Sequence, residues 1–273
     1  MYHNYYYYNK EELLKSPKIP LIVRENNEAV FKAMAEEMLA EIKEKNMRGE
    51  KTVFICPVGP VGQYTYFIEL VNKEKVSLKN VWFINMDEYL TDDRQWIPKE
   101  HRLSFRGFMD RMVYSKISGE LVMPEAQRVF PDPDNIARIP ELIEALGGVD
   151  ICFGGIGING HVAFNEASDE LSPEEFLKLK TRVLKIAKET RAVNSIGALN
   201  GALDDMPQYC ITVGFSEISQ ARKIRLGCFR DWHRAVVRHA AYGEKSAHFP
   251  VSLLQDHKNI NIQLTEFVAD LPE

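Results

Sequence analysis

Six short apolar segments recur along the chain, and they constrain the fold more than any other feature of the sequence. Each is rich in β-branched or aromatic residues, and most are continuous instead of alternating with polar residues. Such runs are typical of strands covered on both faces, as in a parallel sheet. The six segments are TVFICPV (52–58), VWFINM (81–86), VDICF (149–153), YCITVGF (209–215), KIRLGCF (223–229) and NINIQL (259–264).

Helical patterns lie between these apolar segments. Residues 136–146 and 231–243 read as helices, the second with Gly243 placed to end it. A third stripe at helical spacing is formed by Val30, Phe31, Met34, Met38, Leu39 and Ile42. The alternation of strands and helices predicts a doubly wound, mostly parallel α/β sheet, and 273 residues fit one large domain.

Composition favours small molecules as partners. The net charge of −5 gives no basic footprint for nucleic acid or for an anionic membrane. No apolar run approaches the ~20 residues that span a bilayer, and the tyrosine-rich start lacks the order of a signal peptide. We therefore expect a cytoplasmic protein that binds neither nucleic acid nor membrane.

The four cysteines are expected to be small buried residues. They lie far apart in the sequence, each in or beside a predicted strand. That spacing does not resemble a zinc site or a disulfide framework. The four are Cys56, Cys152, Cys210 and Cys228.

The segment FGGIGINGHVAFNEAS (153–168) is the strongest candidate site. It follows a predicted strand, and ligands of open α/β sheets bind at the carboxyl ends of strands. Its glycines let the backbone turn tightly near a ligand, while His161 and Glu166 supply a proton carrier and its partner. A lone histidine is more often structural, but here the glycines, the histidine and the glutamate occur together. The glycines are Gly154, Gly155, Gly157 and Gly160.

Two weaker candidates follow the first two predicted strands. In CPVGPVGQ, Gly59 and Gly62 precede a helix expected near Tyr64, and the loop is either an anion cradle or a plain tight turn. In NMDEY, Asp87 and Glu88 point to opposite sides of an extended chain, so at most one faces a given reacting atom. A helix cap or a surface acid pair is the alternative for these carboxylates.

The charged segment 167–180 has two interpretations. SPEE predicts a helix start, with serine as the cap and proline in the first turn. The segment is then either a mobile cover over a site or a solvated surface helix.

Four motifs in this order resemble the glucosamine-6-phosphate deaminase (isomerase) family. They are FINMDEYL, GGIGINGHVAFNE, TRAVNS and PQYCITVG, and the resemblance covers roughly residues 20–265. It implies a modified Rossmann-like domain over 20–273, preceded by an N-terminal extension over 1–19. Family members convert an amino sugar phosphate to fructose 6-phosphate and ammonia without a metal or nucleotide, so no cofactor is expected. Related 6-phosphogluconolactonases typically have a serine-leucine-phenylalanine segment where this chain has AFNE.

The resemblance assigns catalytic roles to residues of two motifs. It implies that Asp87 moves a proton between C1 and C2 of the opened sugar. It also implies that His161 assists ring opening, held in position by Asn159 and Glu166. Many members carry aspartate where Asn159 stands; asparagine still orients an imidazole but cannot stabilise imidazolium as a charge would.

The phosphate site departs from the family pattern. The family loop commonly reads P-T-G-[GS]-[ST]-P, whereas residues 57–62 read PVGPVG, which lacks the hydroxyls and, at Pro60, a backbone donor. Two cations remain: Arg191 matches a family phosphate-binding arginine, and Arg230 occupies the place of a family lysine. An insertion around DELSPEEF further changes what covers the site. The substrate-binding and phosphate-binding residues expected from the resemblance are Gly59, Gly62, Gly155, Gly157, Arg191 and Arg230.

Two classes of function follow from this pattern. The retained Asp87, His161 and Glu166 favour an aldose-ketose isomerase or deaminase acting on an amino sugar phosphate. The altered loop favours the alternative, a regulatory homologue that binds a sugar phosphate without turnover. Lactone hydrolysis is a minor alternative, because it needs no carrier for a C2 proton. The resemblance leaves the sugar epimer and the oligomer size open, with a homo-oligomer among the options.

Overall fold

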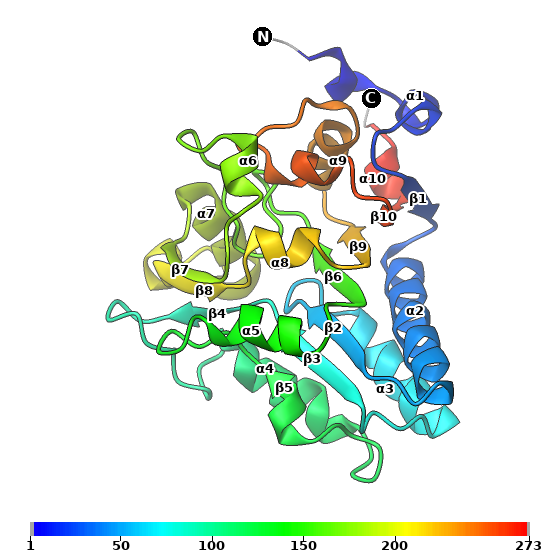
Figure 1. Cartoon of the computed structure of the whole chain (residues 1–273). Coiled ribbons are helices and arrows are strands. Elements are labelled where there is room, and N and C mark those ends of the chain that lie inside the picture. The colour runs from blue at the N-terminus through cyan, green and yellow to red at the C-terminus, as the bar shows by residue number, and fades with distance from the viewer. Residues whose placement is uncertain (1–2, 272–273) are drawn as a thin grey trace.

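A seven-stranded parallel sheet forms the centre of the molecule (Figure 1). The computed structural model describes residues 3–271. Five of the six apolar segments lie in this sheet, which confirms the predicted doubly wound α/β fold. From one edge to the other, the strands are β1 (Leu21–Arg24), β10 (Ile260–Thr265), β9 (Lys223–Cys228), β6 (Ile151–Gly155), β2 (Thr52–Cys56), β3 (Val81–Asn85) and β5 (Arg128–Val129).

One face of the sheet is covered by α2 (Asn27–Met47) and α3 (Gln63–Glu74). Successive strand residues point to opposite faces, so Phe54, Phe83 and Phe153 share this one. They pack against the predicted stripe of α2, whose Val30, Met34, Met38, Leu39 and Ile42 are buried. Phe31 of the same stripe is half-buried and contacts the ring of Phe229 edge-on.

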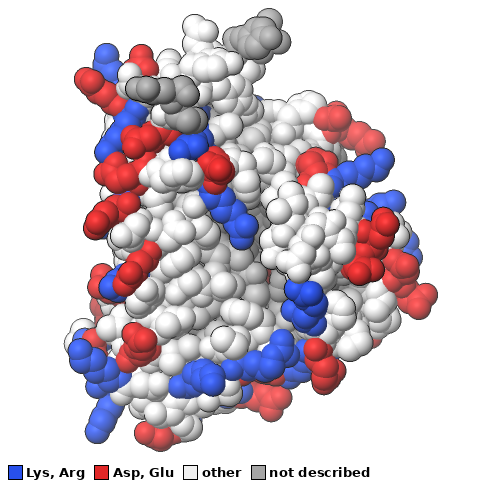
Figure 2. All heavy atoms as spheres, turned by 180° about the vertical axis from the view of Figure 1, so that it is seen from behind, with Lys and Arg blue, Asp and Glu red and all other residues white. Residues whose placement is uncertain are grey.

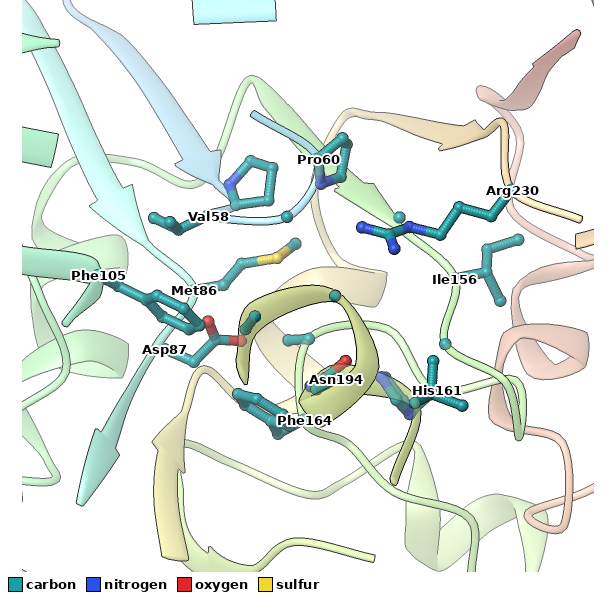
Figure 3. A pocket seen from close by; sticks show the side chains of 18 of the residues that line it. Val58, Pro60, Met86, Asp87, Phe105, Ile156, His161, Phe164, Asn194 and Arg230 are labelled. Carbon is teal, nitrogen blue, oxygen red and sulfur yellow. The ribbon is translucent and has the colours of Figure 1, made fainter. Parts of the chain in front are cut away.

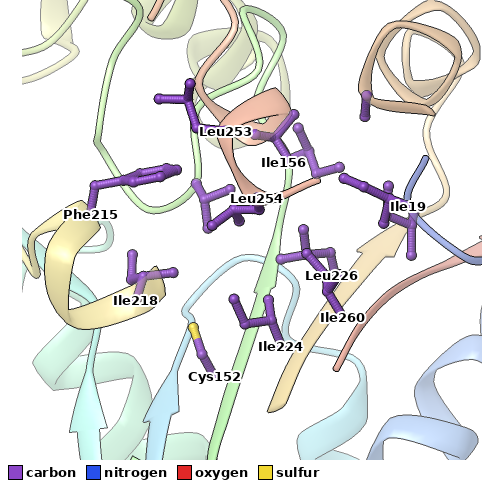
Figure 4. Close-up of a cluster of buried hydrophobic side chains, with 14 of the residues drawn as sticks. Ile19, Cys152, Ile156, Phe215, Ile218, Ile224, Leu226, Leu253, Leu254 and Ile260 are labelled. Carbon is purple, nitrogen blue, oxygen red and sulfur yellow. The ribbon is translucent and has the colours of Figure 1, made fainter. Parts of the chain in front are cut away.

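The opposite face packs against α8 (Phe215–Ser219), α9 (His233–Tyr242) and the turn η5 (Pro250–Leu254). Figure 4 shows this second apolar cluster, with Cys152 and Ile224 of the sheet among its members. The helices predicted over 136–146 and 231–243 are confirmed as α5 (Arg138–Ala145) and α9. Apolar residues on both faces of the strands thus produce the continuous runs in the sequence.

A small antiparallel sheet corrects one expectation. The segment 209–215 was expected to join the parallel sheet, but it forms β8 in a separate sheet and then begins α8. Because β8 is almost as deeply buried as the central strands, its apolar residues do not reveal which sheet it joins. The order of this sheet is β4 (Asp87–Leu90), β8 (Tyr209–Thr212) and β7 (Arg182–Lys185).

The remaining elements lie around these sheets. The helix start predicted at SPEE is confirmed: Ser172 caps α6 and Glu175 completes a capping box. Residues 3–19 pack against α9, with Leu13 and Ile19 buried in the core. The other helices and turns are η1 (Asn4–Tyr7), α1 (Lys10–Lys15), α4 (Phe105–Met112), η2 (Tyr114–Lys116), η3 (Glu125–Gln127), α6 (Pro173–Phe176), α7 (Lys188–Leu199), η4 (Leu203–Asp205) and α10 (Glu266–Ala269).

The cysteines lie where the sequence predicts, and the surface carries charges of both signs. All four cysteines are free and buried, as expected. None of the helices in the described part of the chain is both long and apolar enough to cross a membrane. Basic and acidic side chains both occur on the face shown in Figure 2. The cytoplasmic location and the homo-oligomer stay predictions.

Candidate active site

A cavity of about 460 Å³ lies at the carboxyl ends of four neighbouring parallel strands. The loops after β2, β3, β6 and β9 line it, and α7 forms a further wall through Asn194 and Gly197. Pockets for small ligands in proteins are of this size. Asp87, His161 and Arg230, which are far apart in the sequence, all line this cavity (Figure 3).

Asp87 is the first residue of β4 and faces the cavity. Only 7% of the residue is exposed. Burial, and next the negative charge of Glu88, raise the pKa of Asp87 well above its ordinary value. A carboxyl group with a raised pKa exchanges protons more readily near neutral pH, which suits an acid-base catalyst.

Glu88 points to the other side of β4, as expected for neighbouring strand residues. Its carboxylate accepts hydrogen bonds from the backbone N–H groups of Phe105 and Arg106 at 3.0 and 2.9 Å. It also accepts a bond from the Ser104 hydroxyl at 3.0 Å and pairs with the Arg106 guanidinium at 3.1 Å. Glu88 therefore stabilises the N-terminus of α4, so the helix-cap interpretation holds for one carboxylate of the pair.

His161 lies in the loop after β6, within a network of polar side chains. Its Nδ1 lies 2.7 Å from Asn159 Oδ1 and 3.2 Å from Glu166 Oε2. Both of those atoms are acceptors, so Nδ1 carries the proton and Nε2 is left with a free lone pair. Thr190 donates a hydrogen bond to the same Glu166 oxygen at 3.0 Å. The imidazole at the cavity wall can therefore accept a proton through Nε2.

Glu166 is held as a carboxylate beside this imidazole. Burial alone would raise its pKa, but the neighbouring His161 and the hydrogen bonds from Asn159 and Thr190 bring the pKa below its ordinary value. Its Oε2 lies 3.2 Å from His161 Nδ1. Glu166 itself lies behind the histidine, outside the lining of the cavity.

The position of Asn159 explains why an amide suits this site. The Asn159 Nδ2 group donates to Glu166 Oε2 at 2.8 Å and to Glu189 Oε1 at 3.1 Å. Aspartate at this position would face two other carboxylates without a donor to offer them. Asparagine thus joins two acidic side chains that would repel a third.

Two glycines of the loop are required by close contacts. A Cβ on Gly157 would lie 1.9 Å from an atom of the His161 ring, so no other residue fits beneath the imidazole. Gly160 has a φ of +81° and lies against the ring of Phe249. Gly155 and Gly157 both line the cavity.

The loop after β2 presents apolar side chains to the cavity. Pro57, Val58, Gly59 and Pro60 line it. Gly62 instead lies at the start of α3, where a Cβ would collide with the ring of Phe31. The helix expected near Tyr64 begins at Gln63.

The predicted phosphate-binding arginines are placed differently. Arg230 lines the cavity, and its guanidinium points into it (Figure 3). Arg191 is absent from the described lining, and its Nη2 donates to the carbonyls of Leu203 and Met206 at 3.2 and 2.7 Å. The structure therefore brings Arg230, but not Arg191, together with Asp87 and His161.

The charged segment 167–180 does not reach the cavity among the described residues. Its helix, α6, buries Phe176 against Phe215, at a ring centroid distance of 5.1 Å. The segment is thus anchored to the core by one apolar side chain.

Several polar residues of the cavity wall were not singled out from the sequence. Tyr89 and Asn194 are joined by a hydrogen bond from the amide to the phenol oxygen at 3.2 Å. Arg102, Ser104 and His233 also line the cavity. Tyr89 carried a usable signal, because residues two apart on a strand share a face and Tyr89 lies two after Asp87. Asn194 carried another, since it belongs to the TRAVNS motif.

Comparison with known proteins identifies the family of the chain. No family model matches the chain. Glucosamine-6-phosphate deaminase of Bacteroides fragilis is 32% identical over 246 residues, covering 87% of this chain and 86% of the relative. The enzyme of that name from Clostridium perfringens is 28% identical over 256 residues, covering 92% and 98%.

Solved structures share the fold. A monomeric glucosamine-6-phosphate deaminase superposes with a TM-score of 0.79 at 24% identity, over 91% of this chain and 98% of that one. A 6-phosphogluconolactonase from Trypanosoma cruzi reaches 0.64 at 14% identity, over 93% and 97%. The sequence likeness to the deaminases is the stronger argument, and the chain belongs to the glucosamine-6-phosphate deaminase family, whose members are enzymes of the aldose-ketose isomerase and deaminase type.

Proposed function

We propose that this protein converts glucosamine 6-phosphate, or a closely related amino sugar phosphate, to a ketose phosphate and ammonia. The observation that carries the proposal is the pairing of Asp87 with His161 in one cavity. The carboxyl group has a raised pKa, and the imidazole, whose Nδ1 contacts Asn159, lines the same cavity. Two proton carriers in one cavity suit a reaction with two separate proton transfers.

The proposed chemistry begins with ring opening. His161 Nε2 takes the proton of the C1 hydroxyl and returns it to the ring oxygen as the C1–O5 bond breaks, which gives the open aldehyde. The carboxylate of Glu166 stabilises the imidazolium that forms between these steps.

Isomerisation and deamination follow in the open sugar. Asp87 takes the proton from C2 while the substrate's ammonium group gives a proton to O1 of the aldehyde, which leaves a neutral enolamine. Asp87 then returns its proton to C1, which gives an iminium group at C2. Water adds to this carbon, a proton moves from the added oxygen to the nitrogen, and ammonia leaves as the C2 ketone forms.

Arg230 is proposed to bind the phosphate. Figure 3 shows its guanidinium and the Asp87 carboxylate entering the cavity from opposite sides, as expected when one end of a substrate reacts and the other is bound. The loop after β2 lacks side-chain hydroxyls, so arginine carries more of the phosphate binding than in a hydroxyl-rich loop. We propose that Gly59, Gly155 and Gly157 allow close approach of the sugar.

The test is ammonia release from glucosamine 6-phosphate by the purified protein, with the ketose phosphate measured in parallel. Equal yields of both products are expected. Binding without ammonia release would favour the regulatory alternative, and hydrolysis of 6-phosphogluconolactone in its place would favour a lactonase. In lactone hydrolysis the buried Asp87 would have no C2 proton to carry.

Replacing Arg230 by alanine is expected to raise KM for the phosphorylated substrate by about thirtyfold, and for the free amino sugar by less than about threefold. The reason is that a bound phosphate would lose its main counter-charge. Steady-state kinetics on both substrates measure the difference, and Arg230→Lys shows how much depends on charge alone.

Arg191→Ala is the comparison for this prediction. The structure pairs Arg191 with backbone carbonyls, so its loss is expected to affect both substrates alike. A selective effect on the phosphorylated form would restore the phosphate-binding role that the family resemblance implies. Equal weakening of both substrates by Arg230→Ala would remove Arg230 from the phosphate site.

A further inference from the structure

A buried imidazole that the proposed chemistry does not use lies beside the cavity. His233 is the first residue of α9, and only 3% of it is exposed. Its Nδ1 accepts hydrogen bonds from the backbone N–H groups of Phe229 and Arg230, at 2.8 and 2.9 Å. Its Nε2 lies 3.1 Å from the carbonyl oxygen of Ile156.

These three contacts determine the protonation of the ring. Because Nδ1 accepts two N–H groups, the proton is on Nε2, which donates it to Ile156. Burial lowers the pKa of His233 to about 3, and the positive charge of Arg230 acts in the same direction. The imidazole is therefore neutral near pH 7 and offers no counter-charge to a bound anion.

The imidazole joins two loops that both line the cavity. Phe229 and Arg230 follow β9, while Ile156 follows β6, its neighbour in the parallel sheet. The next residue, Gly157, contacts the His161 ring. One side chain thus connects the loop of the proposed phosphate-binding residue with the loop of the proposed ring-opening residue.

The side chain of Arg230 depends on this connection for its direction. Within residues 3–271, its guanidinium takes part in no hydrogen bond or ion pair. The guanidinium lies near α7, where a Cβ added at Gly197 would be 3.6 Å from Nη1. His233 Nδ1 holds the backbone N–H of Arg230 at 2.9 Å, which fixes the point from which this side chain enters the cavity.

We propose that His233 is a positioning residue that directs Arg230 into the cavity and thereby sets the affinity for the substrate phosphate. This inference rests on the proposed function for the nature of the anion. Removing the imidazole leaves the backbone N–H groups of Phe229 and Arg230 without their acceptor. The turn after β9 then relaxes, and the Arg230 guanidinium is no longer held toward the cavity.

Three variants separate the contacts of the ring. His233→Asn can place its amide oxygen near the position of Nδ1 and keep the acceptor for the N–H groups. His233→Gln can reach the position of Nε2, which keeps the donor to Ile156 but removes the acceptor from its place. His233→Ala removes both. Thermal melting of each variant shows which ones fold.

The expected result is a change in KM without a matching change in kcat. His233→Ala and His233→Gln are expected to raise KM for glucosamine 6-phosphate about tenfold, and kcat stays within about twofold. His233→Asn recovers most of the affinity. If the alanine variant does not fold, the comparison of the glutamine and asparagine variants tests the same point.

The decisive experiment combines each His233 substitution with Arg230→Ala. If His233 acts through Arg230, then replacing it in the Arg230→Ala protein raises KM by less than about twofold further. Additive losses, or equal losses for free glucosamine, would overturn the proposal. Binding of inorganic phosphate, measured by calorimetry in the same variants, tests the positioning role even if the parent protein releases no ammonia.

Discussion

Replacing Asp87 by asparagine is expected to lower turnover by about 10²- to 10⁴-fold while the protein stays folded. The amide fills the same volume on the cavity-facing side of β4 but cannot accept a proton from C2 and return it to C1. The direct measurement is exchange of the C2 hydrogen with deuterated water, followed by NMR in the preferred substrate. Exchange at the parental rate would show that Asp87 is not the base.

Stability gives an independent check on the same variant. The folded state raises the pKa of Asp87, so it holds a proton that the unfolded chain releases at lower pH. Between these two pKa values the folded state binds more protons, and stability therefore falls as pH rises. The asparagine side chain does not titrate, so the variant does not lose stability in this way as pH rises. The variant is expected to melt at or above the parental temperature near neutral pH, and its advantage should shrink below about pH 4, the ordinary range of an aspartate.

Glu88→Gln is the matched control, since it changes the neighbouring carboxylate on the opposite side of the strand. Glu88 holds the start of α4 and pairs with Arg106, so this change is expected to lower stability. It also removes the charge that helps to raise the pKa of Asp87. C2 exchange is expected to persist, with its acidic limb moved to lower pH. Complete loss of exchange in both variants would point to a folding defect instead of a missing base.

The parallel sheet could be predicted because its strands are buried on both faces. Phe54 and Ile55, for example, point to different apolar clusters, so the run TVFIC contains no polar alternation. The small sheet could not be predicted in the same way. The pairing of β4 with β8 joins segments more than a hundred residues apart, and β8 is as apolar as a central strand. No feature of the local sequence predicts that pairing.

Part of the candidate site could likewise be predicted from the sequence, and part could not. Asn159, His161 and Glu166 lie within eight residues, so one loop brings them together. The cluster can therefore be recognised in the sequence. Asn194 and His233 reach the cavity from separate helices. Asn194 belongs to the TRAVNS motif, but nothing near His233 in the sequence indicates that it contacts the cavity. The partners of Arg191 are likewise tertiary, because the carbonyls it contacts belong to residues 203 and 206.

The loop after β2 differs from the pattern that the family resemblance implies, and on the proposed function this affects how the cavity binds phosphate. Val58 lines the cavity at a position where the family pattern implies a side-chain hydroxyl, and Pro60, also in the lining, lacks a backbone N–H. An anion there depends on Arg230 and on backbone N–H groups near the start of α3. On the proposed function, recognition of phosphate is concentrated in fewer contacts, and we expect a single substitution at Arg230 or His233 to have a larger effect.

His161→Gln is expected to slow turnover of the cyclic substrate about a hundredfold, and that of an open-chain analogue by less than about threefold. Glutamine fills part of the space over Gly157, but its amide cannot carry a proton from the C1 hydroxyl to the ring oxygen. An open-chain substrate does not need that transfer and proceeds directly to Asp87. Steady-state kinetics on both forms give the ratio.

Glu166→Gln provides the graded control for this last prediction. It keeps an oxygen within reach of His161 Nδ1 and of the Thr190 hydroxyl, yet removes the charge that stabilises imidazolium. We expect a smaller loss than for His161→Gln, of about tenfold, and again selective for the cyclic form. If both variants slowed the cyclic and open-chain forms equally, the histidine would act after ring opening. Another residue of the cavity wall would then carry the proton to O5. Tyr89 is a candidate, because it lines the cavity and its phenol hydroxyl can donate a proton.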